Sequence, residues 1–379
     1  MNNKCTLIID GNWLLMNKLF VGSIQNYFNV DNDQSEKIKG MNLLVESMAQ
    51  SISFTCRRFT DIVDNIIYVQ DGGSWRKSIV PPVQLSDADY KGTRKKSSNT
   101  DWTYVFEAAN TLANNLKALN IQTHQEFGVE GDDWVFYWSK KLLEAGSNVI
   151  IWSIDNDLKQ LVRVSPQGNF VSWFQNKSGL FLPIDLQKET TVEDDIDMFM
   201  QPDIFNNTLE NLKKKFKPDD IHYIDSWKIV VEKIICGDAG DNVLPIYSWR
   251  KGKKNYRLTE KHINDIINKL KIKSIPEFID RWEDVNSECM KVLKGKELLF
   301  ENKIIEHFYH NVQMVWLNDS VYPDDIKSLM ESNGGVTYTN PSIIKDISQN
   351  LHTISSSSNE QELDTLFTGV ATQFDDIPF

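Results

Sequence analysis

Three short aliphatic runs, each followed closely by an acid, constrain the fold of this chain more than any other feature. Runs of this length and composition are typical of buried parallel strands. They cover residues 5–9, 65–69 and 148–152, and amphipathic helical patterns lie between them at 41–63, 105–119 and 132–146. The alternation predicts an α/β domain whose sheet is mostly parallel and doubly wound.

Acids stand where these predicted strands end. Asp10 and Asp71 follow the first two strands, and Asp155 and Asp157 follow the third. Because ligands of open α/β sheets bind outside the carboxyl ends of the strands, we expect these side chains to converge. Further acids open a helical pattern or lie in a glycine-rich turn, namely Glu130, Asp132, Asp133, Asp238 and Asp241.

Taken singly, each acid has an ordinary explanation as a turn or helix-capping residue. Taken together, the nine carboxylates have no matching set of lysines or arginines beside them and would repel one another strongly. Divalent cations would remove that repulsion, and ligands that are all oxygens suit Mg²⁺ or Mn²⁺. The sequence therefore predicts two such ions about 4 Å apart, an arrangement used to cleave phosphodiesters.

The stretch SIDNDLKQL places Asp155 and Asp157 two residues apart. In an extended chain, the alternation of side chains points both acids to the same side. We therefore expect this pair to bridge the two neighbouring metal sites.

The net charge of −12 argues against a protein that coats nucleic acid indiscriminately, yet basic residues are concentrated in two places. One is YKGTRKK at 90–96, and the other is 250–273, which contains nine lysines or arginines but only two acids. Basic islands in an acidic chain indicate a bounded track for a nucleic-acid backbone.

Cysteine usage and apolar run length bear on the compartment. The spacing of Cys5, Cys56, Cys236 and Cys289 suggests neither a zinc site nor a disulfide framework, which favours a reducing cytosol. The N-terminus lacks the pattern of a signal peptide, and no apolar run approaches the ~18 residues that cross a bilayer. We therefore expect a cytoplasmic protein without membrane contact.

Six motifs in a fixed order resemble those of the flap-endonuclease-like 5′ nucleases, and most closely the bacteriophage 5′→3′ exonucleases called phage ribonuclease H. They are LIIDGNWLL, the acid at Asp71, YKGTRKK, GVEGDDW, SIDNDLKQL and GDAGDNV, and together they cover residues 6 to about 270. The resemblance implies a PIN-like nuclease domain, followed by a helical domain with a helix-hairpin-helix region that grips duplex backbone. The chain departs from the family by a basic insert in that region and by a long stretch between Asp157 and Asp238.

The resemblance also implies roles for individual residues. The first ion would be held by Asp10, Asp71, Glu130, Asp132 and Asp155, with Asp133 a ligand or the neighbour of one, and the second by Asp157, Asp238 and Asp241. Lys91 and Arg94 of the arch motif would contact the scissile phosphate, although a solvated basic loop is the plain alternative. Residues that would bind nucleic acid are Tyr90, as a stacking surface, Lys95, Lys96, Arg250, Lys251, Lys253, Lys254 and Arg257.

The expected boundaries are an N-terminal nuclease domain at 1–184 with an arch at about 72–105, an acidic insertion or long loop at 185–225, a helical domain at 226–350 and a disordered tail at 351–379. In the tail, ELDTLF resembles peptides that bind sliding clamps, and FDDIPF resembles the tip of single-stranded-DNA-binding proteins. Leu366, Phe367 and Phe379 would be the apolar anchors of such contacts. A tail that only aids solubility is the alternative.

The function expected from this reading is a Mg²⁺-dependent 5′→3′ exonuclease with flap-endonuclease activity, with Mn²⁺ able to substitute. It would act as a monomer on DNA and RNA/DNA duplexes with 5′ ends or flaps, removing RNA primers or DNA flaps during phage or bacterial replication. The resemblance favours a phage origin, in which case the compartment would be the cytoplasm of the host bacterium. An inactive accessory protein that binds branched DNA is the alternative. The nine acids disfavour it, because without metal their repulsion would have no compensation.

Overall fold

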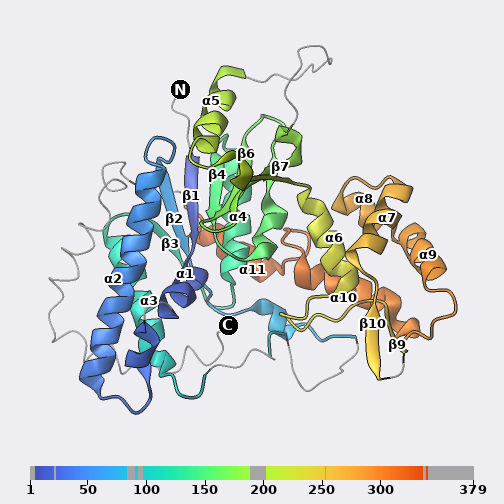
Figure 1. The fold of residues 1–379 in the computed structure, drawn as a ribbon, viewed down its shortest axis with the longest axis horizontal. Coiled ribbons are helices and arrows are strands. Elements are labelled where there is room, and N and C mark those ends of the chain that lie inside the picture. Colours follow the sequence, from blue (N-terminus) through green and yellow to red (C-terminus); the bar gives the residue numbers. More distant parts are fainter. Residues whose placement is uncertain are drawn as a thin grey trace. The chain divides into compact units, whose positions relative to one another are not determined.

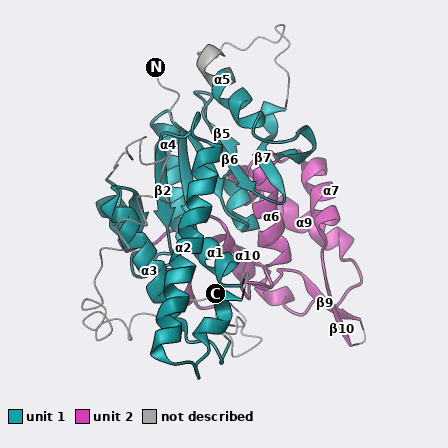
Figure 2. Cartoon of the chain, turned by 60° about the vertical axis from the view of Figure 1, so that its left-hand side comes forward, with its two compact units in different colours: residues 1–74, 96–224, 328–377 teal, residues 75–95, 225–327, 378–379 magenta. Residues whose placement is uncertain are grey.

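The computed structural model describes residues 5–20, 23–82, 90–92, 97–187, 202–251, 253–335 and 339. The chain divides into two compact units, which Figure 2 shows in different colours. Unit 1 comprises residues 1–74, 96–224 and 328–377, and unit 2 comprises residues 75–95, 225–327 and 378–379. Each unit buries its own set of apolar side chains.

Unit 1 is built on a sheet that has eight strands among its described residues (Figure 1). Its path runs β3-β2-β1-β4-β6-β7-β8, and β5 pairs with β6 beside that path. All neighbours on the path are parallel except β6 and β7, so the predicted α/β fold with a mostly parallel sheet is confirmed. The strands are β1 (Cys5–Asp10), β2 (Asn65–Val69), β3 (Gln122–His124), β4 (Asn148–Trp152), β5 (Arg163–Val164), β6 (Phe170–Gln175), β7 (Gly179–Pro183) and β8 (Ile221–Ile224).

The three strands that were predicted from aliphatic runs are neighbours in this sheet. β1 pairs in parallel with β2 and with β4, and every residue of the three strands is buried. Burial on both faces explains why their sequences are continuously apolar rather than alternating. In the register, Asp10 lies opposite Val69, and Ile9 lies opposite Trp152. The carboxyl ends of the three strands therefore lie together at one edge of the sheet.

The helices of unit 1 carry the amphipathic patterns of the sequence. The pattern predicts that one helix starts at residue 41, whereas α2 starts at 34, after the N-cap Asp33. Its first turns are polar and therefore carry no apolar signal. Helices α1, α2 and α3 pack against one another, and α4 packs on the central strands. The helices are α1 (Gly11–Leu19), α2 (Gln34–Arg58), α3 (Trp102–Ala118), α4 (Gly131–Glu144) and α5 (Pro202–Lys213), with short 3₁₀ helices η1 (Ile24–Phe28), η3 (Asn156–Leu161), η4 (Ile184–Leu186) and η5 (Pro218–Asp220).

The segment expected to be an insertion or long loop at 185–225 contains regular structure in its described part. It holds α5, and it ends in β8, which pairs in parallel with β7 at the edge of the sheet. The strand was not foreseen because it is only four residues long, alternates weakly and lies in a polar region. Most of the acidic run, from 193 to 201, lies outside the described residues.

Unit 2 is mainly helical, as the sequence predicts, and contains one antiparallel hairpin. Its core includes Trp282, whose ring stacks on Phe308 with centroids 3.9 Å apart. The elements are η2 (Trp75–Ser78), α6 (Ser226–Cys236), β9 (Ser248–Lys251), β10 (Lys254–Arg257), α7 (Glu260–Leu270), α8 (Ile275–Asp280), α9 (Trp282–Val292), η6 (Glu301–Lys303) and α10 (Ile304–Val315); α11 (Asp324–Asn333) crosses from unit 2 into unit 1.

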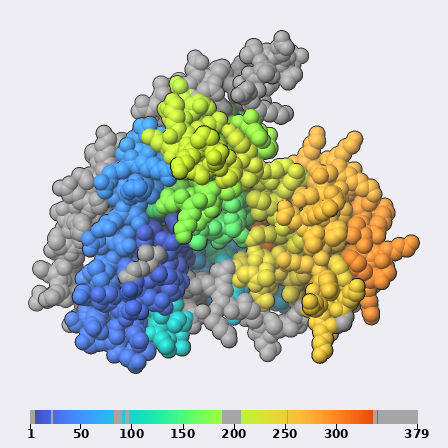
Figure 3. Space-filling model, in the orientation of Figure 1, coloured from blue at the N-terminus to red at the C-terminus, as the bar shows by residue number. Residues whose placement is uncertain are grey.

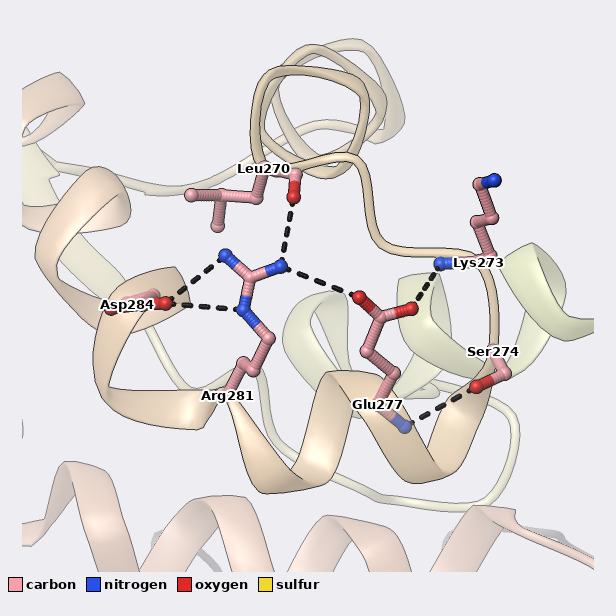
Figure 4. A network of polar contacts seen from close by, with 6 residues as sticks. All are labelled: Leu270, Lys273, Ser274, Glu277, Arg281 and Asp284. Carbon is pink, nitrogen blue, oxygen red and sulfur yellow. Dashed lines mark hydrogen bonds and ion pairs between the residues drawn. The ribbon is translucent and has the colours of Figure 1, made fainter.

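One arginine ties three of these helices together. Arg281, between α8 and α9, donates to the carbonyl of Leu270 at the end of α7 and to the carboxylates of Glu277 and Asp284 (Figure 4). The guanidinium provides several donors in one plane, so a single side chain satisfies a helix end and two acids. The contacts fix the corner that α7, α8 and α9 form.

The chain returns to unit 1 after α11, which differs from the expectation that 226–350 form one helical domain. Gly334, Gly335 and Thr339 make hydrogen bonds to α4 and to strands β3 and β2 of unit 1. These bonds join Gln122 to the carbonyl of Gly335, Lys141 to the carbonyl of Gly334, and Asn65 to Thr339. Among the described helices, none is long and apolar enough to cross a membrane.

Candidate metal centre

Asp10 ends β1 and caps α1. Its carboxylate accepts the Trp13 N–H at 3.0 Å and the Ser153 hydroxyl at 2.6 Å. Burial and, to a lesser degree, the charge of Asp155 raise the pKa of Asp10, while hydrogen bonds from Ser153, Trp13 and Asn12 lower it, and the net result is a pKa of about 6. The chain therefore keeps a carboxylate in an environment that disfavours its charge.

Ser153 connects two of the predicted ligands. Its hydroxyl donates to Asp10 and accepts the N–H of Asp155 at 2.9 Å. It is fully buried directly after β4, so its position is set by the sheet. Sequence reasoning missed this residue because a lone serine carries no charge, although its place between a strand and an acid was a usable signal.

The expectation for Asp155 and Asp157 was wrong in its geometry. The chain does not stay extended here, because Asp155 is the N-cap of η3 and its carboxylate accepts the N–H of Asp157 at 2.8 Å. Asp157 thus lies in the first turn of a 3₁₀ helix, where strict alternation of side chains no longer applies. The cap itself is an ordinary use of an aspartate.

Asp71 is held at the start of α4. Its carboxylate accepts the Gly131 N–H at 2.5 Å, and its own N–H donates to the side chain of Asn12 in α1. Gly72 lies so close to the carbonyl of Glu126 that any side chain would collide with it. The loop after β2 is therefore locked to the loop before α4, next to Glu130.

Three more predicted ligands lie at the start of α4. Glu130 is its N-cap, and the N–H of Glu130 donates to the carboxylate of Asp133 at 3.3 Å. Glu130 and Asp133 are both buried, while Asp132 is partly exposed. Asp133 thus has a capping role in addition to any role near a metal.

The acids of unit 1 suit a divalent cation. No lysine or arginine in the described part of the chain pairs with Asp10 or Asp155, and Asp10 is buried. Burying an ionised carboxylate is costly without a counter-charge, and the other acids at the adjacent strand ends only add negative charge. A cation bound by these carboxylate oxygens would supply the missing positive charge. Oxygen donors without nitrogen or sulfur fit Mg²⁺ or Mn²⁺.

The two acids of GDAGDNV lie in unit 2, in the loop after α6. Gly237 has a φ of 69°, which allows the tight turn there. Burial raises the pKa of Asp238, but its hydrogen bond and ion pair with Lys233 outweigh that effect, and the net shift is downward. One of the nine acids thus has a basic partner, because the end of α6 places Lys233 beside Asp238.

Two residues of the arch motif also form hydrogen bonds to this loop. The Tyr90 hydroxyl donates to the carboxylate of Asp241 at 3.1 Å, and the Lys91 N–H donates to the carbonyl of Asp241. The Tyr90 ring packs against the core of unit 2 and is only half-buried, and Lys91 is buried with a φ of 57°. Arg94, Lys95 and Lys96 lie outside the described residues.

The basic insert folds as the antiparallel hairpin of β9 and β10, which projects from the surface of unit 2 (Figure 3). Lys251 lies directly opposite Lys254. Four exposed cations of the hairpin make no ion pair with any described residue, and these are Arg250, Lys251, Lys253 and Lys254. Arg257 differs, because it donates to the carbonyl of Cys236 and anchors the hairpin to α6.

The other predicted contacts, Leu366, Phe367 and Phe379 of the tail, lie outside the described residues.

Residues 5–191 match the family model described as "5'-3' exonuclease, N-terminal resolvase-like domain". Residues 5–191 belong to this family. The exonuclease domain therefore spans β1 to η4 and carries Asp10, Asp71 and Asp155, and the protein is a 5′ nuclease, a hydrolase of phosphodiester bonds.

Solved structures of bacteriophage T5 proteins resemble the whole chain weakly. A T5 protein co-crystallised with metal ions has a TM-score of 0.47 at 16% identity, over 93% of this chain and 99% of that one. The T5 5′-exonuclease with bound zinc has a TM-score of 0.45 at 17% identity, over the same shares. A T5 flap endonuclease complexed with DNA and metal ions has a TM-score of 0.44 at 16% identity, over 93% and 100%. The assignment rests on the family match, since similarity at this level decides nothing, and no curated protein matches the chain.

Proposed function

We propose that the exonuclease domain works with two divalent cations held by its carboxylates. The first would be held by Asp10, Asp71, Glu130, Asp132 and Asp155, with Asp133 beside them, and the second by Asp157, Asp238 and Asp241. The observation that carries this proposal is the buried Asp10 carboxylate, which has no cationic partner among the described residues. Bound ions would lower the pKa of water near the phosphate and stabilise its developing negative charge.

The protein's own residues prepare this site. Ser153 orients the carboxylate of Asp10 against the backbone of Asp155. Asn12 and Gly131 hold Asp71 in place. Lys91 and Arg94 would bind the scissile phosphate, and Tyr90 would border the strand there, with Lys95 and Lys96 attracting the backbone.

The proposed substrates are duplexes with 5′ ends or flaps, as DNA or as RNA primers on DNA. The exposed hairpin cations support binding to duplex backbone, because they are concentrated on one short element and form no ion pair with a described acid. We further propose Mg²⁺ as the natural ion, a monomeric enzyme in the cytoplasm of a phage-infected bacterium, and a tail that contacts a sliding clamp or a single-stranded-DNA-binding protein. The four described cysteines are free thiols, which suits a reducing compartment.

Asp155→Asn should abolish cleavage while leaving DNA binding largely unchanged. The substitution removes a charge needed to hold metal but keeps the side chain's size, so we expect a loss of about a thousandfold or more in rate. A 5′-labelled flap is incubated with Mg²⁺ or with EDTA, and binding is measured separately in EDTA. Asp185→Asn, at an exposed acid, is the matched control. Wild-type protein that binds the flap but shows no metal-dependent cleavage would support the accessory-protein alternative instead.

Ser153→Ala tests whether this hydroxyl orients a metal ligand. We expect the Mg²⁺ concentration for half-maximal cleavage to rise about tenfold, with most of the rate recovered at saturating Mg²⁺, because outer hydrogen bonds tune ligand geometry. Ser172→Ala is the control, since the Ser172 hydroxyl is also buried but donates to the carbonyl of Val149 in the sheet. An equal change in both variants would mean that a general packing defect is responsible.

A further inference from the structure

A cavity of about 720 Å³ opens on unit 1 beside the carboxylates described above. Its walls are formed by α1, α2, the end of β4 and the turn between β6 and β7, which Figure 1 labels. Trp13, which lines it, also donates its backbone N–H to Asp10, and Ile154, another lining residue, precedes Asp155. The cavity therefore adjoins the ends of β1 and β4 without including the metal ligands.

The residues that line this cavity carry positive charge only. Three are cations, Lys18, Arg57 and Lys177, and none is an acid. None of the three forms an ion pair with any described residue, and the one described acceptor of the Arg57 side chain is the Ser53 hydroxyl. Burial lowers the pKa of Lys18, which means that its charge is partly removed from water without a compensating partner. An anion would supply that partner.

Aromatic groups lie among these cations. Phe54 on α2 lines the cavity and is 67% exposed, so its ring is accessible to a ligand. Trp13 and Trp152 meet edge to face, with centroids 5.2 Å apart. A flat apolar surface beside positive charge is the chemistry that binds a base and its phosphate, and a cavity of this size has room for one nucleotide.

We propose that this cavity, the cation pocket, binds one unpaired nucleotide of a single-stranded nucleic acid. A phosphate would lie near Lys18 and Lys177, and the base would stack on Phe54. A duplex offers no free base face, whereas an unpaired strand does. This proposal rests on the proposed function only for the origin of the strand, which would be the single-stranded part of a substrate cut at the adjacent site.

The test measures binding in EDTA, so that neither metal nor cleavage is involved. A short oligothymidylate with a 3′ fluorophore is titrated with the full chain, and anisotropy is recorded. Lys18→Gln combined with Lys177→Gln should weaken binding about tenfold, and Phe54→Ala should weaken it about fivefold. The matched controls are Lys117→Gln, at an exposed lysine of α3, and Phe20→Ala, at an exposed ring outside the pocket, and both should bind like the wild type.

An oligomer of the same length without bases separates the two parts of the site. It should remain sensitive to the double lysine variant but be indifferent to Phe54→Ala. Unchanged oligothymidylate binding by the double variant overturns the proposal, and so does an equal effect of Phe54→Ala on both oligomers. Thymidine monophosphate that displaces the oligomer at equal concentration would mean that the pocket holds a free nucleotide, which also overturns it. A failure of metal-dependent cleavage leaves all these measurements valid, so the two proposals can fail separately.

Discussion

Asp10→Asn is expected to abolish cleavage and, in the same protein, to stabilise the metal-free fold. The lost activity follows from the loss of a proposed metal ligand. The gain in stability follows from burial, which raises the Asp10 pKa from 3.8 to about 6. An ionised Asp10 therefore opposes folding at neutral pH, and a neutral isostere removes that cost. We expect the free energy of unfolding in EDTA at about pH 7.5 to rise by about 1–2 kcal/mol, less than the full shift implies because asparagine makes weaker hydrogen bonds.

The pH dependence gives the control for this prediction. Because the folded-state pKa is raised, the folded protein binds more protons than the unfolded chain between about pH 4 and 6, so the metal-free wild type should gain stability as the pH falls from 7.5 towards 5. Asp10→Asn should lack this part of the gain, and Asp185→Asn should retain it. Urea unfolding at several pH values provides the measurement. An Asp10→Asn protein that is less stable than the wild type in EDTA at pH 7.5 would contradict the reading of Asp10 as a strained, buried charge.

Neutralising the four exposed cations of the hairpin is expected to weaken duplex binding about a hundredfold at low salt and to flatten its salt dependence, since each lost phosphate contact reduces the slope by about one unit. The change is Arg250, Lys251, Lys253 and Lys254, each to Gln. The fold should not suffer, because Lys251 and Lys254 face each other across the hairpin and their like charges repel. Binding is measured in EDTA over a range of salt concentrations, and thermal unfolding is recorded alongside.

A second set of four lysines serves as the control for total charge. Lys213, Lys214, Lys215 and Lys217 lie at and after the end of α5, and changing all four to Gln alters the net charge equally. That variant should keep the wild-type salt slope. If both quadruple variants lost the same part of the slope, net charge rather than the hairpin would account for binding, and the duplex track would have to be placed elsewhere.

The central sheet was predictable because burial on both faces leaves a continuous apolar signal. The observed β2 and β4 coincide with the predicted runs, and β1 extends one residue further, to Asp10. The outer strands were missed because they lack such a continuous apolar signal. β3 has only three residues, and β8 is only partly buried, so neither has a pattern that stands out from a loop. The basic insert was recognised by its charge, but its hairpin geometry was not foreseen.

The acidic residues of the candidate site could be predicted from the sequence, but the hydrogen bonds that position their side chains could not. Charge makes Asp10 and Asp155 conspicuous in the sequence, whereas Ser153 becomes visible only when its hydroxyl is seen between them. The geometry of Asp157 could not be foreseen either, because a single capping bond converts an extended chain into a 3₁₀ turn. Lys233 escaped notice because the end of a helix, rather than adjacency in sequence, brings it to Asp238.

The return of the chain to unit 1 after α11 has a consequence for biosynthesis. Hydrogen bonds join Gly334, Gly335 and Thr339 to α4, β3 and β2, which precede them by 193 to 274 residues in the chain. A ribosome releases the N-terminal strands long before it has made these partners. The exonuclease domain therefore gains these three contacts only after residue 339 has been translated, and a chain shortened upstream of Gly334 would lack them.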